Sequence, residues 1–219
     1  MLKINLISNE KLEKLNGFLK TDKFKNNFAD SFINRNFELK MEDIQEQYVP
    51  KLKCDIFISY CHDDEKYAKA IASHLIKLGY TVFIDCLFWK SIDEALRKYD
   101  DKYSKQDDGL YNYNKRNKST STFHMILTDS IIETIRCSKV YITINTKKYA
   151  SEGRTASPWI YLENKIANEQ TTTNLILGDS VEKRLREFVT YPVKFNGYYT
   201  AKSFDEVKTL LEKYKVYLY

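Results

Sequence analysis

The segment from Lys53 to Asp85, KCDIFISYCHDDEKYAKAIASHLIKLGYTVFID, constrains the fold more than any other part of the chain. Its first apolar run, residues 54–58, is too apolar for a half-exposed strand, so it predicts a central parallel strand covered on both faces. A helix follows, with its buried stripe at Tyr67, Ile71, Leu75 and Leu78. Residues 81–85 return as a second strand. This strand–helix–strand unit predicts an α/β fold.

Local signals mark the ends of that first helix. Asp63 or Asp64 is predicted to cap its N-terminus. Gly79 supplies the left-handed residue that ends it.

The pattern of alternating strands and helices continues toward the C-terminus. We expect helices near 129–137, 181–189 and 203–215, and strands at 140–144, 173–179 and 191–199. Ser203 and Glu206 have the spacing of a capping box at the start of the last helix. The sequence therefore predicts a doubly wound sheet of parallel strands.

Two segments depart from this pattern. Residues 1–50 carry apolar side chains at helical spacing, which predicts a short N-terminal helical extension before a main domain at 51–219. An insert lies around 86–128. Residues 86–104 are compatible with a helix, and residues 105–123 are polar and rich in Asn, so we expect a long surface loop there.

Composition excludes several classes of function. The six glycines include neither G-x-G-x-x-G nor a P-loop motif, and the four cysteines and three histidines show no zinc spacing, so no cofactor or metal is expected. A net charge of +5 with mixed signs disfavours nucleic-acid binding. With no membrane-length apolar run and no signal-peptide core, the sequence predicts a cytoplasmic protein with free thiols.

Ligands of open parallel sheets bind at the carboxyl ends of the strands. Here, Ser59, Tyr60 and Cys61 leave the first strand, and Ser157 with Pro158 starts a helix after the third. Glu163 falls on the apolar side of that helix, four residues after Trp159. It is interpreted either as a surface-edge glutamate paired with Lys165 or Arg154, or as a site carboxylate in a partly dry cleft.

Two stretches resemble the Toll/interleukin-1 receptor (TIR) domain family. They are CDIFISYCHDDEKYAKAIASHLIKLGYTVFID and SIIETIRCSKVYITINTKKYASEGRTASPWIYLENKIA, whose S-x-W-x-x-x-E is the helix signature of the family. The resemblance implies a flavodoxin-like sheet. The R-D-x-x-P-G loop of animal adaptor members is replaced by DCLFWKSIDEA, so the chain looks like a bacterial member. Phe88 and Trp89 are the candidate residues of that loop.

Enzymatic members of the family cleave NAD+, and their signature glutamate is catalytic, which implies that role for Glu163. Ser59, Tyr60 and Cys61 would line the same cleft, and Trp159 or Tyr161 would stack on a ring of the substrate. Nicotinamide leaves as a neutral group, so a single carboxylate that stabilises positive charge on the ribose is sufficient. The product is ADP-ribose or a cyclic isomer.

The resemblance also implies partners. TIR enzymes assemble through TIR–TIR contacts, so we expect a homo-oligomer, and a Thoeris-like setting adds a separate effector that responds to the nucleotide product in antiviral defence. The alternatives are a non-catalytic TIR–TIR interaction module, a virulence effector, and a nucleoside-processing enzyme on a related fold.

Overall fold

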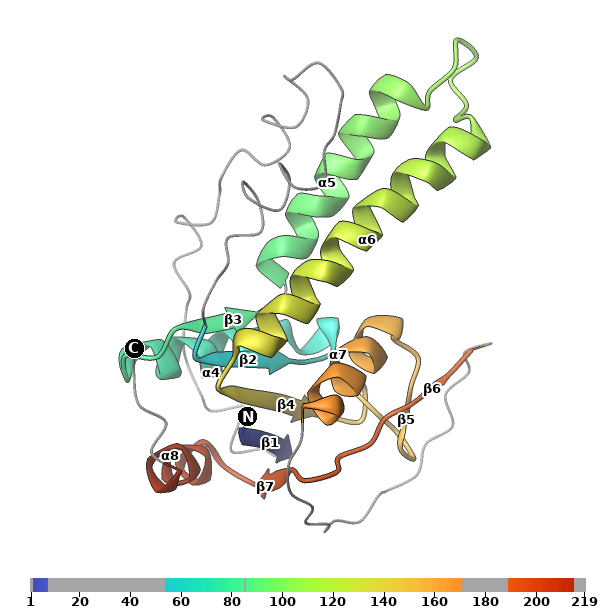
Figure 1. The fold of residues 1–219 in the computed structure, drawn as a ribbon. Coiled ribbons are helices and arrows are strands. Elements are labelled where there is room, and N and C mark those ends of the chain that lie inside the picture. The colour runs from blue at the N-terminus through green and yellow to red at the C-terminus, as the bar shows by residue number, and fades with distance from the viewer. Residues whose placement is uncertain (1, 8–53, 85, 171–188, 215–219) are drawn as a thin grey trace. The chain divides into compact units, whose positions relative to one another are not determined.

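The computed structural model describes residues 2–7, 54–84, 86–170 and 189–214 (Figure 1). Its strands are β1 (Leu2–Ile7), β2 (Ile56–Ser59), β3 (Val82–Ile84), β4 (Val140–Asn145), β5 (Arg154–Thr155), β6 (Tyr191–Pro192) and β7 (Tyr199–Ala201). Its helices are α4 (Glu65–Lys77), α5 (Cys86–Tyr103), α6 (Tyr113–Cys137), α7 (Pro158–Glu169) and α8 (Phe204–Lys213), with a 3-10 turn η2 (His62–Asp64) before α4.

The chain forms two compact units. Among the described residues, the first unit holds 2–7, 54–84, 134–170 and 189–214, and it contains both sheets. The second holds 86–133, which is α5 and most of α6. The prediction of one main domain at 51–219 does not separate these units.

The main sheet has five strands in the order β3-β2-β4-β1-β7, and all its pairings are parallel. A short antiparallel pair, β5 with β6, lies apart from it. The predicted α/β fold with a parallel sheet is therefore present.

Both faces of the sheet are covered. One face carries the isoleucines Ile4, Ile56, Ile58, Ile142 and Ile144, all buried. The opposite face carries a row in which Phe83, Phe57, Tyr141 and Lys3 lie side by side on adjacent strands. The rings of Phe57 stack on those of Phe83 and Tyr141, at centroid distances of 5.1 and 5.5 Å. Burial on both faces explains why the strands read as apolar runs.

The N-terminus corrects one expectation. Residues 2–7 do not begin a helical extension; they form β1, which pairs with β4 and β7 inside the sheet. The segment alternates Leu2, Ile4 and Leu6 with Lys3 and Asn5, which is the period of a strand. The helices expected between residues 9 and 50 lie outside the described residues.

The helix allowed at 86–104 is present as α5, whereas the surface loop expected at 105–123 is wrong over most of its length, because α6 begins at Tyr113. α5 and α6 form a helical hairpin whose turn, residues 104–112, closes with a bond from the Asn112 amide to the Ser104 carbonyl at 2.7 Å. α6 has no Gly or Pro, and its buried residues Ser119, Phe123, Ile126, Leu127 and Ile131 recur at helical spacing. Its polar and Asn-rich start masks this stripe in the sequence.

Several local predictions are confirmed. Gly79 adopts φ +95° after α4, and the Ser157 and Ser203 hydroxyls cap α7 and α8. The Glu206 carboxylate accepts from the Lys202 amide at 2.8 Å, one residue before the cap. The strand and helix expected within 173–188 lie outside the described residues.

Other details differ. Neither Asp63 nor Asp64 caps α4 with its side chain, because η2 comes first and turns both carboxylates elsewhere. Leu78, predicted to be buried, is 47% exposed because α4 ends one residue earlier. Within the described part of the chain, no helix combines the length and apolarity needed to cross a membrane.

Candidate functional site

Ser59 and Glu163, which are 104 positions apart, meet in the first unit. Ser59 is the last residue of β2, and its hydroxyl donates to Oε2 of Glu163 at 2.5 Å. The two residues are 1% and 2% exposed. α7 therefore covers the face of the sheet on which Ser59 lies, at the carboxyl end of a central strand. This is the edge at which open parallel sheets hold their ligands.

The start of α7 sets the position of Glu163. Ser157 accepts from the Ile160 amide at 3.3 Å, and Pro158 occupies the first helical position. The buried side of the helix consists of Ile160, Glu163, Asn164, Ile166 and Ala167. Trp159 and Leu162 are only half-buried. The buried side thus runs through Ile160, Glu163 and Asn164.

Asn164 fixes the rotation of α7. Its amide nitrogen donates to the Lys194 carbonyl at 2.8 Å, and its amide oxygen accepts from the Lys194 N–H at 3.0 Å. This pair of bonds imitates a backbone pairing between the helix and residue 194. Glu163, the preceding residue, is consequently held toward the sheet.

Tyr149 completes a chain of hydrogen bonds to the carboxylate. Its phenol lies 3.0 Å from the Ser59 hydroxyl, and its side chain is buried. Since Ser59 gives its single hydrogen to Glu163, Tyr149 must be the donor in the bond to Ser59. Burial, followed by the charge of Glu163, raises the pKa of Tyr149, so the phenol keeps its hydrogen. The chain runs from Tyr149 to Ser59 to Glu163.

Two more buried tyrosines belong to this region. Burial raises the pKa of Tyr141 well above its ordinary value, and Tyr149 and Glu163 raise it further. The same causes, burial first, act on Tyr198, whose ring meets that of Tyr141 edge-on at 6.2 Å. Lys3 of β1 places its amine 4.8 Å from the Tyr198 ring centroid and donates to the Asn196 carbonyl at 2.6 Å.

The other predicted site residues are placed differently. Tyr60 is buried and follows the last residue of β2. Cys61 is half-buried and packs against the core cluster of Tyr149, Ile160 and Val193. Burial raises the pKa of its thiol, which disfavours a nucleophilic thiolate.

Tyr161 stacks on Tyr191 of β6 at a centroid distance of 5.2 Å. It lies two residues before Glu163, about 200° around the helix, so its ring faces away from that carboxylate. Trp159 is half-exposed near the N-terminus of α7. Phe88 and Trp89 fall in α5 rather than in a loop. Ser59 is thus the predicted residue that reaches Glu163 directly.

The interpretation of Glu163 as a surface-edge glutamate is wrong. Arg154 is engaged by Thr190, donating to its hydroxyl at 2.7 Å and its carbonyl at 2.6 Å, and Lys165 is exposed. Glu163 itself is buried on Ser59. With 2% exposure, it reaches a substrate only when the side chains around it move.

No family model, curated protein or solved structure matches this chain.

The turns after β2 and β4 are tied together beside the cluster. Thr146 donates its hydroxyl to the buried Asp64 carboxylate at 2.5 Å. Lys148 pairs with Asp63 at 3.0 Å on the surface. The first bond matters more, since it is buried and anchors the turn that carries Tyr149.

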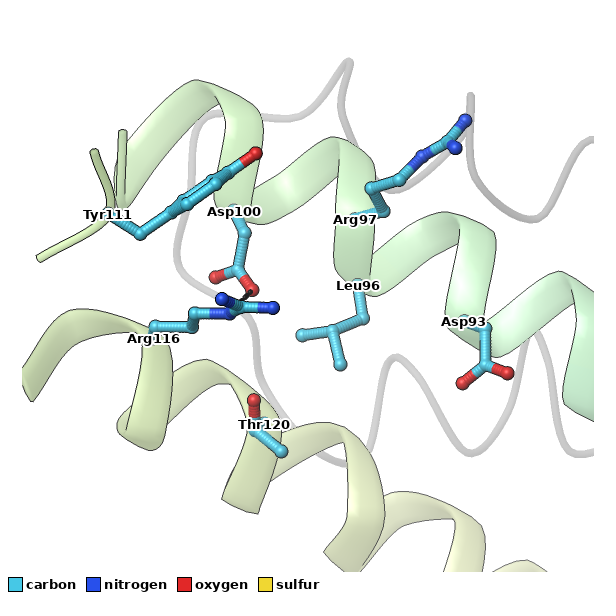
Figure 2. A pocket seen from close by; sticks show the side chains of 7 residues that line it. All are labelled: Asp93, Leu96, Arg97, Asp100, Tyr111, Arg116 and Thr120. Atoms are coloured by element: carbon cyan, nitrogen blue, oxygen red, sulfur yellow. Dashed lines mark ion pairs between the residues drawn. The ribbon is translucent and has the colours of Figure 1, made fainter. Parts of the chain in front are cut away.

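A separate cavity of about 230 Å³ lies in the helical hairpin, within the second unit (Figure 2). Its lining includes Asp93, Leu96, Arg97, Asp100, Tyr111, Arg116 and Thr120. Asp100 is buried and accepts from the hydroxyls of Ser104 and Ser119 at 2.8 and 2.6 Å. Figure 2 shows Arg116 directed at Asp100, at 3.6 Å, and Arg97 pointing away from it. These contacts join α5 to α6.

Sequence reasoning missed Tyr149, Tyr141 and Asn164. Tyr149 lies in an irregular segment with no periodic signal, and Tyr141 is indistinguishable from the other apolar residues of its strand.

Among the described residues, no group of three or more His, Cys, Asp or Glu side chains is arranged to hold a metal ion.

Proposed function

We propose that the chain is a TIR-like NAD+ nucleosidase that uses Glu163 as its catalytic carboxylate. The observation that carries the proposal is the Glu163 carboxylate, bonded to Ser59 at the carboxyl end of β2. A buried, oriented carboxylate is the group needed to stabilise positive charge that develops on a ribose.

The topology supports the same proposal. In chain order the five strands lie 3-2-4-1-5. The part β3-β2-β4 matches the 2-1-3 part of the flavodoxin-like order 2-1-3-4-5, whereas the N-terminal strand β1 takes the fourth place. The family that the sequence resembles is expected to have the flavodoxin-like order, and the three strands β3, β2 and β4 agree with it. In that fold, the ligand lies near the end of the strand that carries Ser59.

The chemistry requires only one carboxylate. The bond from ribose to nicotinamide breaks with the electron pair leaving on the ring nitrogen, so the leaving group departs neutral without a general acid. Positive charge grows on the ribose, and Glu163 stabilises it. Attack by water gives ADP-ribose, and attack by a group of the substrate itself gives a cyclic isomer.

Because Glu163 is buried, we expect the enzyme to be active only in a state that exposes this carboxylate. A carboxylate that is 2% exposed in a single chain must be uncovered before NAD+ reaches it. We expect a homo-oligomer, formed through TIR–TIR contacts, to uncover it. A separate effector would then respond to the nucleotide product. The same burial favours the second candidate function, a non-catalytic interaction module in which Glu163 is structural.

The test is NAD+ consumption by the purified chain, at high concentration and again when clustered on beads, with products separated by chromatography. Glu163→Gln removes the charge, and Glu169→Gln changes an exposed glutamate of the same helix. Loss of activity in Glu163→Gln alone supports the enzyme. An inert wild-type chain under both conditions supports the interaction module, and cleavage of free nucleosides but not NAD+ would identify a nucleoside-processing enzyme.

A further inference from the structure

We propose that Tyr149 is a positioning residue for Glu163 and acts on it through Ser59. This inference deepens the proposed function and rests on it for its meaning in catalysis. Its geometry is independent of any substrate.

The argument begins with the single hydrogen of Ser59. The hydroxyl lies between two partners, Glu163 at 2.5 Å and Tyr149 at 3.0 Å, and it donates to only one of them. When Tyr149 donates to Ser59, the serine is left to donate to Glu163. A hydrogen bond donated to the carboxylate favours the ionised form.

The reverse direction has the opposite effect. If Ser59 donated to Tyr149, the carboxyl of Glu163 would keep its contact with Ser59 only by donating a hydrogen of its own. That arrangement requires a protonated Glu163. The two directions of the chain thus differ by one proton on the catalytic group, and the phenolic hydrogen of Tyr149 selects the ionised one.

Tyr149 is held firmly enough to make this selection. Its amide donates to the Thr146 carbonyl at 3.1 Å, and its side chain packs against Ile160 and Val193. Thr146 is in turn bonded to the buried Asp64. Since its phenol is buried and stays protonated, it remains a donor over the whole range in which proteins are folded near neutrality.

The titratable groups around the cluster come from several elements. Tyr141 of β4 and Tyr198 before β7 both interact with Glu163 and Tyr149, and the Lys3 amine of β1 lies over the Tyr198 ring. The Tyr198 phenol lies 3.4 Å from the Asn164 amide nitrogen, whereas Tyr149 is bonded to Ser59. Tyr198→Phe is therefore a matched control, because Tyr198 is likewise a buried tyrosine.

The first experiment is independent of activity. The side-chain carboxyls of glutamate are labelled with ¹³C, the resonance of Glu163 is assigned with Glu163→Gln, and its titration is followed by NMR. We expect the midpoint to lie at higher pH in Tyr149→Phe than in wild type and to be unchanged in Tyr198→Phe. If Glu163 stays ionised down to acid unfolding, the midpoint pH of that unfolding takes its place and shifts in the same direction.

An unchanged midpoint in Tyr149→Phe, or an equal shift in Tyr198→Phe, overturns the proposal. If Tyr149→Phe does not fold, Ser59→Ala interrupts the same chain, and its midpoint must rise likewise. A midpoint that falls or stays unchanged in Ser59→Ala also overturns the proposal.

The second experiment uses NAD+ cleavage. Tyr149→Phe is expected to lower kcat about 2–10-fold, the effect of one net hydrogen bond, with KM for NAD+ unchanged and the acid limb of the pH profile moved upward. If the titration midpoint of Glu163 rises in Tyr149→Phe but the wild-type chain cleaves no NAD+, the proposed function is refuted and the positioning role stands. Cleavage with an unmoved acid limb in Tyr149→Phe would refute the positioning role alone.

Discussion

Thr146 donates its hydroxyl to the buried carboxylate of Asp64, at 2.5 Å, and thereby joins the turns that follow β2 and β4. The two residues are 82 positions apart in the chain. The bond brings the end of the first central strand next to the turn that carries Tyr149.

Thr146→Val tests that bond. The substitution keeps the shape but leaves the Asp64 carboxylate without this donor, so we expect the free energy of unfolding to fall by about 1–3 kcal/mol. Urea denaturation measures it. Lys148→Ala, which removes only the exposed pair with Asp63, should change the free energy of unfolding much less, because solvent screens that pair. If the free energy of unfolding falls equally in the two variants, the buried bond stabilises the fold no more than the exposed ion pair does.

Glu163→Gln should separate activity from stability. Removing the charge is expected to lower NAD+ cleavage about 10²–10³-fold. The amide oxygen still accepts from Ser59, and the cost of burying a charge disappears, so the free energy of unfolding should stay equal or rise. Turnover and urea denaturation are measured on one preparation, with Glu169→Gln as control. A large loss of stability in Glu163→Gln would indicate a structural glutamate.

Lys3 gives a prediction about pH. Burial lowers its pKa from 10.5 to about 8. Below about pH 8, Lys3 is protonated in both the folded and the unfolded chain, and the folded chain bears the full cost of burying the charge. Between about pH 8 and 10.5, only the unfolded chain keeps the proton on Lys3. The free energy of unfolding should therefore rise with pH in this window. Above about pH 10 the buried tyrosines act in reverse, because their raised pKa values let only the unfolded chain ionise.

The rise is measured by urea denaturation between about pH 7.5 and about pH 9.5, where tyrosine ionisation contributes little. Lys3→Met should flatten it, whereas Lys213→Met, at an exposed residue of α8, should not. An identical rise in wild type and Lys3→Met would assign it to another group.

Gly109 is a test of the hairpin turn. It adopts φ +83°, and a Cβ there would meet no heavy atom within 4 Å, so only backbone strain opposes a side chain. Gly109→Ala should cost about 1–2 kcal/mol, and Gly109→Asn less, because Asn tolerates this conformation better. Thermal unfolding of the two variants side by side measures the order. A larger loss for Asn would contradict the strain argument.

The sequence alone determined the elements whose signals are local. The run at 54–58, the glycine after α4 and the Ser157–Pro158 start of α7 each act within a few residues, so β2, α4 and α7 were predicted close to their observed bounds. The alternation in residues 2–7 is equally local and has the period of a strand, but the helical spacing of the residues after it led to the wrong prediction of a helix there. The polar start of α6 concealed a helix whose apolar stripe begins only at Phe123.

Tertiary structure decided which of these elements meet. Strand pairing is not written in any one strand, so only the assembled sheet places β1 between β4 and β7. Only packing of α7 on the sheet brings Tyr149, Ser59 and Glu163 together across 90 and 104 positions. The sequence marked Glu163 as an unusual carboxylate. Its burial and the direction of its hydrogen bonds come from contacts between distant segments, because a buried carboxylate needs donors that its own helix does not supply.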